Sequence, residues 1–140
     1  MEANAEKFVN WLETNGERNS AICFYTGNTG STLVWRKMTS FQVRFGCQSI
    51  GSLLAKAGIN RTDTGQWKDG LEWTATSRAL AGIAQGKVVV ILGQTWNPAG
   101  VWNTVELPVL EDARSRGVVT SIEKYTMVDV DGKLDGPVLL

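Results

Sequence analysis

An aromatic ring, a hydroxyl and a carboxylate occur at close spacing between Trp73 and Glu106. Trp73 and Ser77 are four residues apart, so on a helix their side chains share one face. Trp102 lies four residues before Glu106, where the pattern predicts the opening of a strand. Side chains at the ends of adjacent elements can converge, and α/β folds commonly carry their sites there.

Composition narrows the chemistry that these residues could perform. The 140 residues include no histidine and only two cysteines, Cys23 and Cys47. This excludes Ser–His and Cys–His nucleophile pairs, histidine general bases and a cysteine zinc site, and no metal site is expected. Lysine plus arginine equals aspartate plus glutamate at 14 each, so the net charge favours neither a nucleic acid nor an anionic membrane as partner.

The periodicity predicts an α/β fold in which a small, mostly parallel central sheet is flanked by helices and preceded by an N-terminal helical segment. We expect one domain over 1–140, helical over about 1–70 and sheet-rich over about 71–140. The first 17 residues are acidic and amphipathic and lack the layout of a signal peptide, which favours a cytoplasmic protein or a secreted or delivered effector domain.

Individual elements follow from apolar spacing and from turn residues. For residues 31–45 the pattern favours a helix but also tolerates a strand. Residues 118–130 fit one long strand or a strand pair, and Asp131-Gly132 indicates a turn. The other expected elements are helices at 3–14, 48–57 and 71–85, strands at 20–25, 87–92 and 101–107, and a short helical segment at 111–116.

Charge is uneven along the chain although its sum is zero. Residues 31–70 contain six basic and two acidic side chains, which gives a local charge of +4 (6 − 2). These basic residues fit two interpretations. They lie on solvated helix faces, or they attract a phosphate-bearing small molecule weakly. The basic residues are Arg36, Lys37, Arg44, Lys56, Arg61 and Lys68.

The spaced motif in the second half of the chain resembles the core of the ADP-ribosyl cyclase / NAD glycohydrolase family. The motif reads Trp73-x-x-x-Ser77-Arg78, then an apolar strand, then Trp102-x-x-Val105-Glu106. The resemblance implies an enzyme that breaks the nicotinamide–ribose bond of NAD or NADP and releases ADP-ribose or cyclic ADP-ribose. NAD would be the substrate, and no cofactor would be needed.

The resemblance also implies roles for individual residues. Glu106 would be the catalytic carboxylate, stabilising the positive charge that develops on the ribose. Trp73, Ser77 and Trp102 would bind substrate, with the cationic nicotinamide ring stacking on an aromatic wall. Nicotinamide leaves as a neutral molecule and needs no acid, so a chain without histidine can perform this reaction.

The resemblance extends more weakly upstream. Residues 21–27 resemble the first core strand of the family, and Tyr25 would take the position of a pocket tryptophan. Trp35 is a competing match for that position. Residues 45–50 resemble the segment that carries the family's second acid, and Gln48 would stand in its place. Gln48 can hydrogen-bond a carboxamide but carries no charge, so the balance between hydrolysis and cyclisation stays open.

Other features of this chain differ from those of secreted animal members of the family, because the disulfides are absent and the N-terminal helical part is short. A short member of this kind without disulfides is expected to be an intracellular enzyme or a delivered toxin domain. A toxin domain would imply an immunity or antitoxin protein as partner.

Two other functions compete with this interpretation. The first is a mono-ADP-ribosyltransferase toxin domain, although Ala75-Thr76-Ser77 and Glu106-Leu107-Pro108 match its motifs poorly. The second is a non-catalytic interaction module that uses a tryptophan-rich surface.

Overall fold

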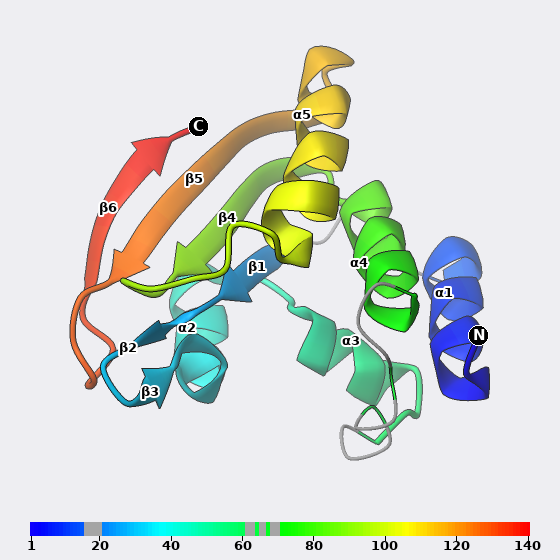
Figure 1. The fold of residues 1–140 in the computed structure, drawn as a ribbon. Coiled ribbons are helices and arrows are strands. Elements are labelled where there is room, and N and C mark those ends of the chain that lie inside the picture. The colour runs from blue at the N-terminus through cyan, green and yellow to red at the C-terminus, as the bar shows by residue number, and fades with distance from the viewer. Residues whose placement is uncertain (16–20, 61–63, 65–66, 68–70) are drawn as a thin grey trace.

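The computed structural model describes residues 1–15, 21–60, 64, 67 and 71–140. These residues form the mixed α/β fold that the sequence predicts (Figure 1). The helices are α1 (Ala3–Asn15), α2 (Met38–Phe45), α3 (Ile50–Lys56), α4 (Glu72–Ile83) and α5 (Leu107–Ser115), with a 3-10 turn η1 (Val34–Lys37) and a π-helix η3 (Trp102–Glu106). The strands are β1 (Cys23–Thr26), β2 (Asn28–Thr29), β3 (Thr32–Leu33), β4 (Gly86–Leu92), β5 (Val119–Met127) and β6 (Leu134–Leu139).

The main sheet has the order β1-β4-β5-β6. β1, β4 and β5 are parallel, and β6 returns antiparallel to β5 as the outer strand. β4 is central, and its run from Val88 to Leu92 is buried throughout, as expected for a strand that is covered on both faces. The register places Tyr25, Ile91 and Tyr125 side by side on the three parallel strands.

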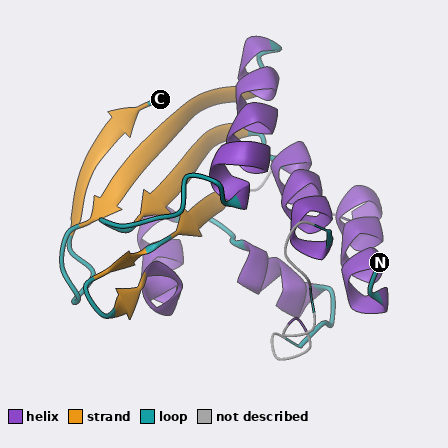
Figure 2. Cartoon of the chain, viewed as in Figure 1, coloured by secondary structure: helices purple, strands orange, loops and turns teal. Residues whose placement is uncertain are grey.

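The alternation of side chains divides the apolar core into two layers, one on each face of the sheet. Phe24 and Val90 belong to the larger layer, which α1, α3, α4 and α5 complete. Cys23 and Ile91 belong to the smaller layer, which η1 and α2 cover from the opposite side. Figure 2 shows the helices on both sides of the sheet, with α1 outermost beside α4.

Most predicted elements are confirmed with small shifts in their ends. The predicted helix 71–85 is α4, the strand 87–92 is β4, and the long strand within 118–130 is β5. The predicted helix 31–45 is only partly correct, because Thr32–Leu33 form strand β3 and regular α-helix begins at Met38. Glycine often follows the last residue of a helix, so Gly16 is expected to end the predicted helix 3–14, but it lies outside the described residues.

The predicted strand over 101–107 is wrong, because residues 102–106 form a π-helix that continues into α5. In an α-helix the Pro108 ring would clash with the carbonyl of Thr104 and offer it no N–H. The backbone avoids this by widening one turn, and the Leu107 N–H bonds to the Trp102 carbonyl, five residues back. Pro108 then occupies the first turn of α5, where a missing N–H costs little.

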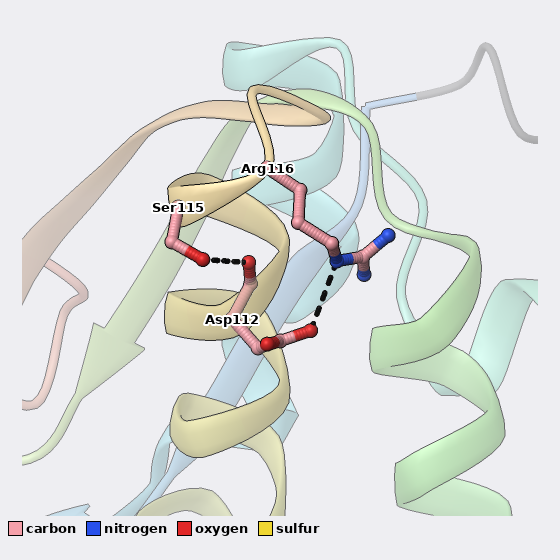
Figure 3. Close-up of polar contacts among 3 residues, drawn as sticks. All are labelled: Asp112, Ser115 and Arg116. Carbon is pink, nitrogen blue, oxygen red and sulfur yellow. Dashed lines mark hydrogen bonds and ion pairs between the residues drawn. The ribbon is translucent and has the colours of Figure 1, made fainter.

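Side-chain contacts close the last turn of α5 (Figure 3). The Ser115 hydroxyl donates to the Asp112 carbonyl at 2.6 Å, and Arg116 Nε donates to Asp112 Oδ2 at 3.0 Å. These side chains are exposed, so the ion pair stabilises the helix by roughly 0.3–0.5 kcal/mol. The turn that follows reverses the chain into β5.

Within the described residues, no helix is both long enough and apolar enough to span a membrane.

The segment after β4 is positioned by a close backbone approach at Gly93. Its N–H donates to the Thr26 carbonyl at 2.9 Å, and Asn28 and Thr95 exchange two backbone hydrogen bonds next to it. A Cβ at Gly93 would lie 2.3 Å from the Asn28 nitrogen, so only glycine fits. In Figure 1 this yellow-green loop then leads to the start of η3.

We therefore predict that Gly93→Ala lowers the free energy of unfolding by about 1–3 kcal/mol or more, because β2 must move away. Gly82→Ala is the matched control, since a Cβ there meets nothing within 4 Å. In helix α4 that change should stabilise the protein by up to about 1 kcal/mol. Urea unfolding measures both variants, and equal effects would contradict the close approach.

Candidate functional site

A cavity of about 190 Å³ lies between β1, α4 and η3. Its walls are mostly apolar and include one carboxylate among the described residues, that of Glu106. The lining residues are Cys23, Phe24, Tyr25, Ile50, Trp73, Leu80, Val101 and Glu106. We call this space the Glu106 cavity.

Glu106 is buried with only 6% of its surface exposed. Within the described part of the chain, no hydrogen bond or ion pair reaches its carboxyl group. Burial therefore raises its pKa from 4.5 to about 8, since nothing offsets the loss of hydration. At neutral pH the group is mainly protonated and uncharged. A carboxyl with a raised pKa that lines a cavity is a frequent sign of a functional site.

Glu106 lies on the buried face of its helix, because the buried residues Leu110 and Ala113 follow it by four and seven residues. Glu106 is the last residue of η3, and Trp102, Val105 and Glu106 are all buried in this single wide turn. Single π turns within helices occur frequently at functional sites. Glu111, five residues further along and on another face of α5, is exposed.

Trp73 and Tyr25 form aromatic walls of the Glu106 cavity. The rings of Trp73 and Trp67 meet in a T-shaped contact, with ring centroids 4.8 Å apart and an interplanar angle of 63°. Trp67 is in turn held by its indole N–H, which donates to Glu2 Oε2 at 2.8 Å. Trp67 also packs on Phe8 of α1, so the start of the chain supports the orientation of Trp73.

Of the six residues predicted for the site, Glu106, Trp73 and Tyr25 meet at one cavity. Of the two candidates for the upstream aromatic wall, Tyr25 lines the Glu106 cavity, whereas Trp35 lines a neighbouring one.

The structure places the other three predicted residues elsewhere. Ser77 is 2% exposed on α4 and does not line this cavity. Trp102 is 3% exposed in the larger core layer, where its ring lies 5.8 Å from that of Phe24. Gln48 extends the sheet beyond β1, because its N–H donates to the Ala21 carbonyl and its carbonyl accepts from the Cys23 N–H. Its side chain does not line the cavity.

Sequence reasoning missed the apolar walls of the cavity. Ile50, Leu80 and Val101 carry no chemical signal, and each fits an ordinary core pattern. The helical spacing of Leu80 on the same face as Trp73 was the one available indication.

Cys23 also lines the cavity, but its thiol is a poor nucleophile. The hydrogen bond to Cys47, together with burial, raises the pKa of the Cys23 thiol far above its usual range. The thiol therefore stays protonated, whereas nucleophilic cysteines are thiolates. Glu106 is left as the group in this cavity whose charge can change near neutral pH.

Among the described residues, no group of three or more acidic or cysteine side chains is arranged to hold a metal ion.

Comparison with known proteins does not assign the chain to a family: no protein-family model matches it, and neither a curated protein nor a solved structure matches significantly.

We predict that Glu106→Gln removes a pH-dependent loss of stability. Below about pH 4.5 Glu106 is protonated in both the folded and the unfolded protein. Between about pH 4.5 and 8 it loses its proton in the unfolded protein but keeps it in the folded protein. The free energy of unfolding of the wild type should therefore fall, relative to that of Glu106→Gln, by on the order of 3 kcal/mol between about pH 4.5 and 7.5. Denaturant unfolding at both pH values measures this difference. A constant difference would show that Glu106 ionises normally.

Proposed function

We propose that this protein cleaves the bond between nicotinamide and ribose in NAD or NADP. The observation that carries the proposal is the buried carboxyl of Glu106, without a partner among the described residues, in a cavity walled by Trp73 and Tyr25. The sequence resemblance to ADP-ribosyl cyclases and NAD glycohydrolases supports the same reaction.

The cavity suits the nicotinamide end of the substrate. The nicotinamide ring of NAD is flat and carries a positive charge, so aromatic faces attract it through both apolar area and cation–π interaction. A cation beside Glu106 also favours the ionised carboxylate, which lowers the pKa of Glu106 and releases its proton on binding. The resulting ion pair lies in a largely apolar space, where electrostatic attraction is stronger than in water.

The reaction then needs one charge to be stabilised. The C1′–N bond breaks with its electron pair going to nicotinamide, which leaves neutral, and positive charge appears on the ribose. The Glu106 carboxylate stabilises this oxocarbenium-like state. Water adds to C1′ and loses a proton to give ADP-ribose, or an adenine nitrogen adds to C1′ to give the cyclic product.

We predict that Glu106→Gln lowers nicotinamide release from NAD by on the order of a hundredfold to a thousandfold, because the amide cannot carry the compensating negative charge. Glu111→Gln is the matched control, since it makes the same chemical change at an exposed position of α5. The assay contains purified protein and NAD without an acceptor protein, and chromatography follows nicotinamide and ADP-ribose.

Two outcomes would contradict this proposal. Equal turnover in folded Glu106→Gln and wild type would remove Glu106 from the reaction. In a parallel assay with an added acceptor protein, ADP-ribose found only on that protein would indicate a mono-ADP-ribosyltransferase instead.

A further inference from the structure

A second cavity, of about 530 Å³, adjoins the Glu106 cavity and shares Tyr25 with it. It lies beside η1, α2 and the start of α3. Its lining residues are Tyr25, Trp35, Arg36, Met38, Thr39, Gln42, Val43, Ser49, Gly51 and Ser52. We call it the Arg36 cavity.

The size of the Glu106 cavity requires a neighbouring subsite. At about 190 Å³ it is below the roughly 300–1,000 Å³ of most small-molecule pockets, so it holds only part of a dinucleotide. Two adjoining cavities could take the remainder. One is the Arg36 cavity, and the other, of about 510 Å³, shares Trp73 and Val101 with the Glu106 cavity.

Charge distinguishes these two cavities. Arg36 lines the first, and it makes no ion pair with a described carboxylate. The described lining of the second contains no charged side chain, only Thr26, Trp73, Thr74, Asn97, Ala99, Gly100, Val101 and Thr104. A pyrophosphate carries negative charge at neutral pH and is bound best by a guanidinium, which offers several donors in one plane.

The Arg36 cavity also offers a surface for a nucleobase. Trp35 is 45% exposed, and the guanidinium carbon of Arg36 lies 4.9 Å from the centre of its ring. Exposed indoles are suitable stacking surfaces for purine bases. Ser49 Oγ donates to Gln42 Oε1 at 3.1 Å, so polar groups of α2 and the α3 cap meet on one wall and can hydrogen-bond hydroxyl or phosphate oxygens.

We propose that the Arg36 cavity binds the adenosine diphosphate half of the substrate, with Arg36 on the phosphates and Trp35 against adenine. The inference rests on the proposed cleavage of NAD, because it assigns the part of the substrate that the Glu106 cavity cannot hold. Tyr25, which lines both cavities, then marks the passage between the two halves of the dinucleotide.

Arg36→Met tests the inference, and Arg44→Met is its matched control. Both arginines are exposed and lie over an aromatic ring, Arg36 over Trp35 and Arg44 over Phe45, but only Arg36 lines the cavity. Calorimetric titration with ADP should give a dissociation constant about tenfold higher for Arg36→Met than for wild type, the effect of losing one charge-assisted phosphate contact. Arg44→Met should bind ADP as the wild type does.

A kinetic experiment uses nicotinamide riboside, which lacks the adenosine and both phosphates of NAD. Arg36→Met should raise KM for NAD about tenfold while leaving the release of nicotinamide from nicotinamide riboside unchanged. If Arg36→Met and Arg44→Met behave alike, or if Thr104→Val weakens ADP binding and Arg36→Met does not, the inference is wrong.

The two proposals fail in different ways. ADP binding that depends on Arg36, without cleavage of NAD, would leave a nucleotide site and overturn the proposed reaction. Cleavage of NAD without any effect of Arg36→Met would support the proposed reaction and overturn the assignment of the Arg36 cavity.

Discussion

The site depends on one physical constraint, which is the burial of the Glu106 carboxyl without a counter-charge among the described residues. A carboxylate in an apolar space loses its hydration, and the folded protein avoids that cost by keeping the group protonated to about pH 8. The group is therefore mainly neutral at neutral pH, and under the proposed function it ionises when the cationic ring binds beside it. In the proposed reaction, binding of the positively charged nicotinamide ring and ionisation of the acid are one coupled event, which would favour a cationic ligand.

Two structural features maintain this arrangement. Glu106 ends the π-helix on the face that Leu110 and Ala113 continue into the core, whereas Glu111 lies on another face of α5 and is exposed. The contact of Trp73 with Trp67, which Glu2 and Phe8 support, fixes the opposite wall. The first residues of the chain thus contribute to a site whose other parts come from β1, α4 and η3. This dependence couples the packing of α1 to the shape of the cavity.

The sequence predicts the layer architecture well, because the apolar runs of β4 and α4 have clear lengths and ends. The sequence-based prediction is wrong between residues 101 and 107. The β-branched and aromatic residues before Pro108 are compatible both with a strand and with the start of a helix. Periodicity carries no signal for a π turn. For the site, the chemical residue types lead to Glu106, Trp73 and Tyr25. Sequence spacing alone does not distinguish Trp73, which lines the cavity, from Trp102, which is also a tryptophan but packs in the core.

The most direct test of this account is infrared difference spectroscopy of the carboxyl groups, wild type minus Glu106→Gln. At about pH 7 the account predicts a protonated carboxylic acid band that belongs to Glu106. Saturating 1-methylnicotinamide, a cation with the same ring, should convert this band to that of a carboxylate at unchanged pH. The absence of a protonated acid band in the free protein, or its persistence with the cation bound, would contradict the account.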